Sequence, residues 1–383
     1  MAFKVNQIYG LVNNAAKESL GAKAIAVKDT GTLVSLGKQV LSSTTDIEQF
    51  YKALTNRIGR TVIAIREFEI TNRSVMREEM EWGIILQKIS YKPHEAVENS
   101  TWNTATQASP FDVEIQTTVV QKLFSVLGTY AYEDSIPDQQ LHTAFKGPAE
   151  MGAFISGIYT NMYNSLKIAE ANLANLAVST YMAGALKAAK PLMARNLLKE
   201  YNTKYSKTLT VDQCLVDADF LKYASKEIND TVKEMQAPSQ VFNAEEIPRQ
   251  TPRDKMVVEV LGKFASATAS YLEADTYHRE LVSLPRYEEV AYWQAPGTEY
   301  KFADVSKINV KHADINSGTA VEQSGIIAFV HDYDAVASII YNRRSASMYN
   351  PRAERMNVFE KADKGYAVDL SENGVVFYVD ASG

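Results

Sequence analysis

The chain has 383 residues, of which 46% are hydrophobic and 22% are charged. This composition is typical of a folded protein with two or three domains. The formal net charge is −6 and the pI about 5.6, which argues against sequence-reading contact with nucleic acid, since such proteins usually carry a basic face. The single cysteine, Cys214, excludes an internal disulfide and fits folding in a reducing, cytoplasmic setting.

The sequence predicts neither a secretion signal nor a transmembrane helix. The N-terminal residues Met-Ala-Phe-Lys-Val-Asn lack an apolar core followed by a small-residue cleavage site. No purely apolar stretch reaches the roughly 18 residues that a spanning helix needs. The chain contains 21 tyrosines, a residue favoured at interfaces because one end of its ring is apolar and the other forms hydrogen bonds.

The first 60 residues predict an N-terminal arm. Residues 6–20 show weak helical periodicity, and residues 21–37 are rich in small and turn-forming residues. A short helix is expected to begin with Thr45 or Asp46 as its N-cap and to end at Gly59. Its apolar face consists of Ile47, Phe50, Tyr51, Leu54 and Ile58. The arm has too few large apolar residues for a core of its own, so we expect it to pack on the rest of the subunit or on a neighbour.

Three segments with β-type patterns follow, at residues 61–70, 81–91 and 111–126. Branched and aromatic residues in them are interleaved with polar or charged ones, as in strands with one exposed face. An isolated hairpin is barely stable and leaves unpaired edges. These segments therefore predict a projecting β loop that a neighbouring subunit covers.

Residues 149–190 predict a single long helix, because Pro148 and Pro191 bracket a run without proline. Proline is tolerated at the first helical position, and it restrains the residue before it away from helix. Apolar residues recur at steps of three and four, which places them on one helical face: Met151, Ile155, Ile158, Met162, Leu166, Ala169, Leu173 and Leu176. A helix of this length spans about 60 Å and suits an elongated subunit with several neighbours. A long core helix of an ordinary α+β protein is the alternative.

The rest of the chain alternates short helices and strands. Residues 201–210 are loop-like, and further helices are expected at 217–232 and 332–341. Strands are expected at 256–261, 280–284, 289–293, 325–330, 356–360, 365–370 and 375–379. The sequence Glu372-Asn373-Gly374 predicts a tight hairpin turn between the last two strands.

We find no catalytic, cofactor-binding or metal-binding candidates in the sequence. The histidines lack metal-ligand spacing, and each is expected at the surface or at an interface: His94, His142, His278, His312 and His331. Cys214 lies in no motif, so a buried, inert thiol is expected. Arg343, Arg344 and Arg352 could contact phosphate or form salt bridges between subunits. This absence of chemistry favours a structural protein over an enzyme.

The order of these parts resembles that of tailed-phage major capsid proteins of the Hong Kong 97 fold, in particular the branch of small, short-tailed phages (podoviruses). The segment LTNRIGRTVI at residues 54–63 is similar to the family's junction between arm and loop. Residues 141–145 and 154–165 are similar to the approach to its spine helix, and Asn350-Pro351-Arg352 with residues 365–379 to its closing strands. The shared order and spacing carry this resemblance, because no single motif is specific.

The resemblance implies an α+β fold in four parts. These are an N-terminal arm at 1–60, an extended loop at 61–130, a peripheral domain with the spine helix at 131–195 and 346–383, and an axial domain at 196–345. It implies pentamers and hexamers that close into an icosahedral shell around double-stranded DNA, assembled in the host cytoplasm. A separate scaffolding protein and a portal are expected by analogy.

Two other functions are consistent with the sequence. An encapsulin-like nanocompartment has the same fold but holds protein cargo, and a soluble enzyme with an unrecognised site belongs to a different class. A compact monomer with turnover of a small substrate would favour the enzyme.

Overall fold

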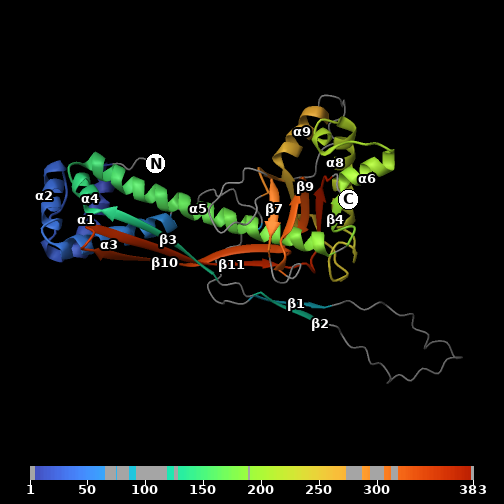
Figure 1. The fold of residues 1–383 in the computed structure, drawn as a ribbon. Helices are drawn as coiled ribbons and strands as arrows, with labels where there is room; N and C mark the ends of the chain where they lie inside the picture. Colours follow the sequence, from blue (N-terminus) through green and yellow to red (C-terminus); the bar gives the residue numbers. More distant parts are fainter. Residues whose placement is uncertain are drawn as a thin grey trace, which may run out of the picture.

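The computed structural model describes residues 5–64, 75, 86–91, 119–124, 128–188, 190–272, 287–293, 306–311 and 318–380. The subunit is elongated: the helix α5 (Pro148–Lys187) runs from a group of helices at one end to a compact unit of sheets and helices at the other (Figure 1).

The other described helices are α1 (Val5–Leu20), α2 (Thr30–Val40), α3 (Thr44–Ala64), α4 (Asp138–Ala144), α6 (Leu197–Tyr205), α7 (Val211–Cys214), α8 (Ala218–Glu234) and α9 (Gly262–Leu272). The strands are β1 (Leu86–Tyr91), β2 (Val119–Phe124), β3 (Gly128–Pro137), β4 (Ala194–Asn196), β5 (Met256–Leu261), β6 (Glu288–Val290), β7 (Lys307–Val310), β8 (Val321–Ser324), β9 (Ile326–Asp332), β10 (Val336–Asn350), β11 (Arg355–Val368) and β12 (Gly374–Tyr378).

The helix α5 confirms the predicted long helix and has 40 residues. Pro148 opens it after the extended residue Gly147. Near its start, burial is one-sided, with Met151 and Ile155 almost fully buried as an amphipathic helix requires. Near its end, residues 177–185 are buried on all sides. The helix α5 is therefore exposed along one side near its start and enclosed by other elements near its end.

Two hydrophobic cores lie at the two ends of α5. The arm core joins the arm helices α1–α3 to α4, to the start of α5 and to the strands β3 and β11. Its largest fully buried side chains include Phe50, Tyr51 and Leu141. The arm thus packs on the rest of its own subunit. The sheet core surrounds the last turns of α5, and its members include Tyr181, Phe329 and Phe377.

Two sheets frame the body of the subunit. An antiparallel sheet in the order β10-β11-β3 runs along α5. A mixed sheet in the order β4-β12-β9-β5-β6 forms the centre of the compact end. Every residue of β5 and β9 is buried, which is the pattern of strands covered on both faces. Gly374 opens β12 against α5, and a Cβ there would lie 2.4 Å from the Tyr181 hydroxyl oxygen.

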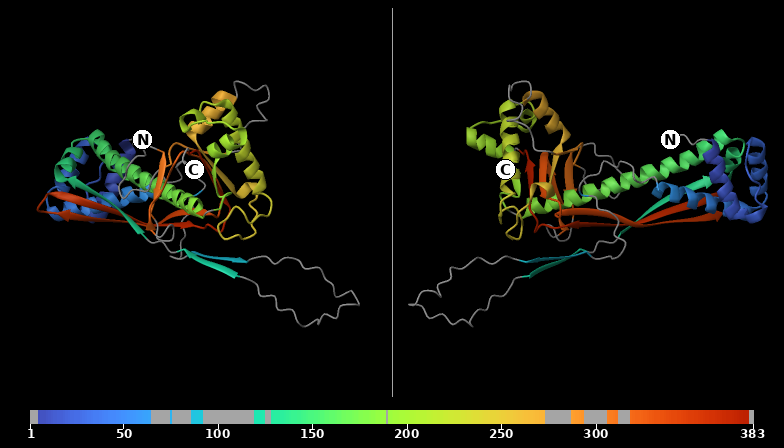
Figure 2. Two further views of the ribbon diagram at one scale, coloured as in Figure 1. Left: turned by 45° about the vertical axis from the view of Figure 1, so that its right-hand side comes forward. Right: turned by 180° about the vertical axis from the view of Figure 1, so that it is seen from behind.

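The hairpin of β1 and β2 lies outside both sheets. The two strands pair antiparallel in register from Leu86 opposite Phe124 to Tyr91 opposite Val119. They run beside the body rather than within it (Figure 2). These strands confirm parts of the segments predicted at 81–91 and 111–126.

Several local predictions for the N-terminal half were wrong. The helix α3 continues past Gly59 to Ala64, so residues 61–64 are not the start of a strand; residues 65–70 lie outside the described part. The hydroxyl oxygen of Ser43 accepts the amide of Asp46 and therefore caps α3 in place of the predicted residues. Residues 30–40 form α2 instead of turns, because Asp29 and Thr32 form a capping box at its start.

Predictions for the C-terminal half were corrected by long-range pairing. The helix expected at 332–341 is the end of β9 and the start of β10, whose residues pair with β11. The strands expected at 356–360 and 365–370 are one strand, β11. No hairpin turn forms at 372–374, because β12 pairs with β9 and β4. The segment 201–210 is helical up to Tyr205, whereas the predicted strands at 256–261 and 325–330 are confirmed.

Candidate assembly surfaces

The root of the β1–β2 hairpin is fixed to the body by a lysine. The Lys88 ammonium lies 2.8 Å from Asp369 Oδ2 and 2.6 Å from Glu372 Oε1. The side chains of both acids are almost fully buried. Burial lowers the pKa of Lys88, but the two carboxylates together raise it by more, so the net shift is upward. Lys88 therefore stays charged and holds the hairpin against the turn between β11 and β12.

The same turn is tied to the compact end. Arg249 Nη1 lies 3.0 Å from Glu372 Oε1, and Arg249 also donates to the Ser371 carbonyl. The Ser371 amide and hydroxyl both donate to Asp369 Oδ1. Removing one partner from a buried ion pair leaves an uncompensated charge, which is costly. These contacts therefore attach the strand β1 of the hairpin to the folded body.

The middle of α5 is joined to the neighbouring sheet by another buried pair. Arg343 of β10 pairs with Glu170 of α5, and both side chains are 8% exposed. The next residue, Arg344, has a different partner, Asp363 of β11, at 2.8 Å between Nη1 and Oδ2. Both arginines therefore brace the subunit internally. Arg343 is too buried to contact phosphate or a neighbouring subunit, whereas the side chain of Arg344 is 45% exposed and its role at an interface stays a prediction.

Asp363 is the centre of a polar network at a bulge in β10. Pairing shifts register between Tyr341 and Arg344, and Asn342 has a φ of 49°, a region that Asn adopts more readily than most residues. Asn342 and Thr129 donate to the same carboxylate as Arg344. The Arg344 guanidinium, helped by these donors, holds the pKa of Asp363 well below its usual value.

The compact end carries a partly exposed aromatic cluster on α6 and α8. Tyr205 is 50% exposed, and the rings of Tyr201 and Tyr223 lie 5.0 and 6.0 Å from its ring. The Lys204 ammonium lies 5.3 Å from the centre of the Tyr223 ring. Beneath the cluster, Arg195 bridges to Glu200 and Glu227. An exposed tyrosine on a rigid base, as Tyr205 is on the buried rings of Tyr201 and Tyr223, is suited to contact another protein.

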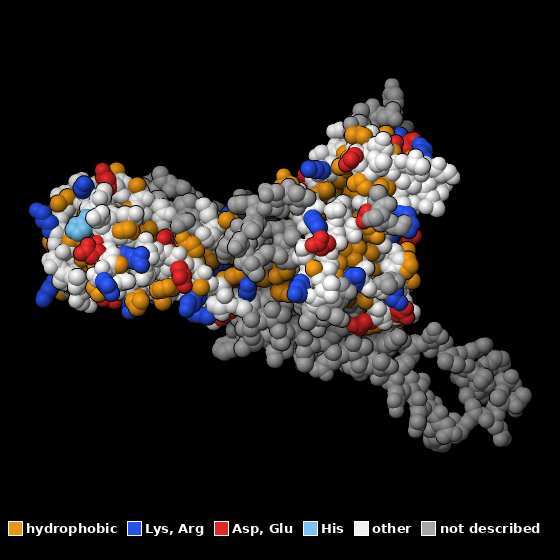
Figure 3. Space-filling model, in the orientation of Figure 1, with side chains coloured by type: hydrophobic (Ala, Val, Ile, Leu, Met, Phe, Trp, Pro, Cys, Tyr) orange, Lys and Arg blue, Asp and Glu red, His pale blue; other side chains and the backbone are white. Residues whose placement is uncertain are grey.

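Surface charge is mixed over the described part of the face drawn in Figure 3. Acidic and basic side chains are interspersed there, and lysines and arginines lie around the end formed by the arm helices. The exposed lysines of these helices and their connections are Lys17, Lys23, Lys28, Lys38 and Lys52. Exposed acids, including Glu18, Asp29 and Glu48, lie among them.

The histidine and cysteine predictions had different outcomes. His142 is exposed on α4 as expected, but the prediction for His331 was wrong, because it is fully buried on β9 and stacks on Phe329. His94, His278 and His312 lie outside the described residues. Cys214 is buried, which confirms the prediction, and burial raises the pKa of its thiol to about 12.

Within the described ranges, no group of three or more His, Cys, Asp or Glu side chains is placed to hold a metal ion. The helices of the same part of the chain include none with both the length and the apolar character of a membrane span. The described residues instead show a long helix, a hairpin outside the two main sheets, and buried ion pairs that join these elements to the body.

Solved structures with the same architecture are phage proteins. The chain is similar to a chain in the capsid structure of Staphylococcus phage Andhra, with 8% identity, a TM-score of 0.52, and 79% of this chain and 82% of that chain covered. It is also similar to a chain in the structure of the head fiber and inner core protein gp22 of native bacteriophage P68, with 9% identity, a TM-score of 0.53, and 80% and 83% covered. The fold is that of a Hong Kong 97-type phage capsid subunit.

The family follows from the sequence itself. The model of the Phi29-like phage major capsid proteins matches residues 12–378, and the chain belongs to that family. No curated protein matches it. The protein is thus a structural subunit and not an enzyme, and it assembles with copies of itself into the icosahedral shell of the virion. This finding favours the phage capsid over the encapsulin-like shell and the soluble enzyme.

Proposed function

We propose that the chain forms pentamers and hexamers, and that these close into the phage head around packaged double-stranded DNA. The observation that supports this most is the β1–β2 hairpin, which lies beside the body while its root is fixed by Lys88. A hairpin that lies outside both cores and is anchored to the body near its base is suited to lie over an adjacent subunit. Many heterologous contacts of this kind, each modest, stabilise a ring when they close on themselves.

We assign the parts of the subunit as arm 1–60, extended loop 61–130, peripheral domain 131–195 with 346–383, and axial domain 196–345. Three strands depart from this division. The strands β4 and β12 lie in the five-stranded sheet with β9 and β5, so residues 194–196 and 374–378 go with the axial domain. The strand β10 pairs with β11 in the other sheet, so residues 336–345 go with the peripheral domain. The exposed Tyr205, with the buried rings of Tyr201 and Tyr223 beneath it, belongs to the axial domain, and we propose that it meets neighbouring axial domains around the symmetry axes.

The proposed partners besides other copies are a scaffolding protein, a portal and the packaged DNA. The scaffolding protein and portal follow from analogy with tailed phages of the podovirus type, as does assembly in the host cytoplasm. The net charge of −6 supports an inner capsid surface that lies next to DNA without binding it tightly, because affinity for DNA comes largely from neutralising phosphates.

Electron microscopy of two chains tests the proposal. The first is the full chain, expressed with the scaffolding protein encoded beside it. The second has residues 92–118, which lie between β1 and β2, replaced by a two-residue turn. We expect shells or capsomer rings from the full chain, and folded subunits without shells from the shortened one. A monodisperse, globular monomer from the full chain under all conditions would contradict the proposal.

A further inference from the structure

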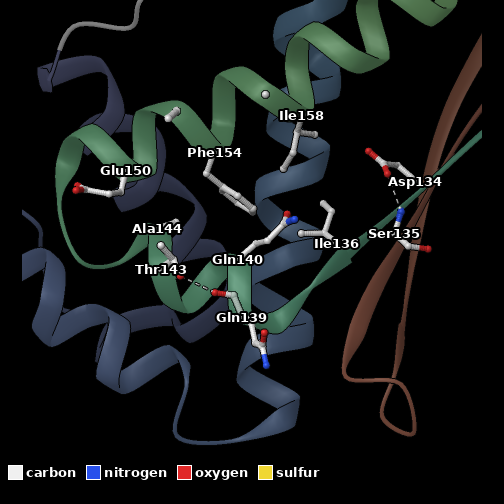
Figure 4. Close-up of a pocket in the computed structure, with 12 residues that line it drawn as sticks. Asp134, Ser135, Ile136, Gln139, Gln140, Thr143, Ala144, Glu150, Phe154 and Ile158 are labelled. Carbon is white, nitrogen blue, oxygen red and sulfur yellow. Dashed lines mark hydrogen bonds between the residues drawn. The ribbon is translucent and has the colours of Figure 1, made fainter.

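A groove lies on the arm-core end of the subunit, between β3, α4 and the first turns of α5 (Figure 4). Its volume is about 820 Å³. Its apolar side is formed by Phe154 and Ile158, which point into it from α5, and by Ile136 of β3, while the polar residues Gln139, Gln140 and Thr143 of α4 also line it. The described side chains that line it include two carboxylates, Asp134 and Glu150, and no Lys, Arg or His. The groove therefore suits an apolar group that is accompanied by positive charge.

The groove is open because α5 presents small residues to it. Ala153 and Gly157 are both exposed and both line the groove, and residues four apart lie on the same helical face. A Cβ added at Gly157 would meet nothing within 4 Å. Phe154 and Ile158 remain half-buried beside Ala153 and Gly157. Among the described residues, no large side chain fills the space over these two small residues.

The chain itself carries a group that matches the groove, at the turn between β10 and β11. Met348 is 57% exposed, which places it among the more exposed large apolar side chains of the described residues. Arg352 and Arg355 are exposed at the same turn, and Glu354 offsets one of their charges. The turn thus offers an apolar side chain with a net positive charge, the complement of a groove with two carboxylates.

The turn is a rigid projection at the same end of the subunit as the groove. The Asp138 amide donates to the Glu354 carbonyl at 3.0 Å, and the Tyr349 hydroxyl donates to Asp138 Oδ2 at 2.5 Å. Pairing of β11 with β3 continues up to Arg355 opposite Pro137. These bonds hold the turn in place on its own subunit. A preorganised projection loses little conformational entropy when it binds.

We propose that the groove receives the β10–β11 turn of a second copy of this chain, with Met348 on its apolar side and the net positive charge of the turn toward its carboxylates. The contact is heterologous, because turn and groove are different surfaces of the subunit, and such contacts propagate around a ring of copies. The inference rests on the proposed self-assembly but makes a separate claim about which surfaces meet.

Cross-linking between copies tests which surfaces meet. The variant Met348→Cys/Ala153→Cys is assembled into shells under reducing conditions, then treated with oxidant or a short bismaleimide and analysed on denaturing gels. We expect ladders of covalently joined chains. Each single variant, which also keeps the buried Cys214, is the control and is expected to remain monomeric on the gel.

The outcomes separate the inference from the proposed function. Intact shells without cross-linked chains overturn the inference and leave self-assembly standing, as do shells in which position 153 joins only to a scaffolding protein. If the unsubstituted chain forms no shells, the proposed function itself fails.

A groove variant with a matched control provides a second test. Ala153→Trp fills the groove, and we expect at least a tenfold lower yield of sedimentable shells while the thermal unfolding of the subunit stays within a few degrees of the parent. Ser35→Trp places the same bulk on the exposed face of α2, outside the groove, and is expected to assemble normally. Normal assembly of Ala153→Trp overturns the inference. If Ala153→Trp greatly destabilises the subunit, Met348→Asp is used in its place. Met348→Asp changes only the exposed turn and is expected to reduce the yield of shells similarly.

Discussion

The two ends of α5 differ in how they complete their packing. At the C-terminal end, residues 177–185 are enclosed on all sides by the strands and helices of the sheet core. At the N-terminal end, Met151 and Ile155 are buried against the arm, while Ala153 and Gly157 remain exposed. One end therefore depends on contacts within the chain. The other leaves a face on which another chain can pack, which is how a capsid subunit can be stable and still assemble.

The largest expected effect comes from a cavity at the enclosed end. Phe329 is fully buried and its ring lies 5.3 Å from that of Tyr181. Phe329→Ala is expected to lower the free energy of unfolding by about 3–5 kcal/mol, because transfer and cavity terms add in a closed core. Urea denaturation of the isolated subunit measures this. Phe154→Ala at the half-buried groove is the control and should cost less than half as much; equal losses would contradict the difference between the ends.

The middle of the helix should respond strongly to loss of one charge. In Glu170→Gln, Arg343 keeps its charge in a site where its side chain is 8% exposed, and we expect a loss of about 3 kcal/mol, as for other broken buried pairs. The double variant Glu170→Met/Arg343→Met should recover most of this loss, since neither charge then remains. Chemical denaturation of the three variants forms the test. A double variant less stable than Glu170→Gln would disprove the account.

The sequence was most informative where local signals agree with tertiary packing. Pro148, Pro191 and apolar residues at steps of three and four were sufficient to predict α5, and the apolar run at 325–330 was sufficient to predict a strand. Prediction failed where distant pairing decides the structure. Residues 336–341 carry a strand signal in Val336, Ile339, Ile340 and Tyr341, which the helix prediction did not weigh, and pairing with β11 makes them a strand.

The contacts that fix the assembly surfaces were less accessible from sequence. Lys88 and its partners Asp369 and Glu372 are distant in the chain, so no spacing rule links them. Arg343 and Arg344 were treated together, yet one reaches the helix and the other reaches β11. Neighbouring residues in a strand point to opposite faces, which was a usable signal once residues 336–350 were known to be a strand. The groove has no sequence signal, because it consists of small residues and the space above them.

A pH-dependent prediction concerns Asp363, which braces the sheet beside the helix. Its pKa is lower in the folded state than in the unfolded chain, so its contribution to stability is full above the unfolded value of about 3.9 and is lost as the pH falls toward the folded value. Asp363→Asn should therefore lower Tm most at pH 6 and by progressively less as the pH falls below about 3.9. Thermal melts of Asp363→Asn measure the difference in Tm between variant and parent at each pH, with Glu48→Gln at the exposed arm surface as the control. A difference in Tm that grows as the pH falls would refute the stabilising role of the Asp363 carboxylate.

The smallest expected effect, and one of opposite sign, contrasts Gly157, which lies near the start of α5, with Gly374, which packs against its end. Gly157→Ala should raise stability by about 0.5–1 kcal/mol, because an exposed glycine within a helix costs that much relative to alanine and the added Cβ meets nothing. Gly374→Ala should instead lower it by about 1–3 kcal/mol, since overpacking a closed site forces neighbours to shift, and the Cβ would lie 2.4 Å from the Tyr181 hydroxyl. Thermal unfolding of both isolated subunits decides the signs. Stabilisation by both would mean that the enclosed end is not closed, and destabilisation by Gly157→Ala would mean that something already fills the groove within a single subunit.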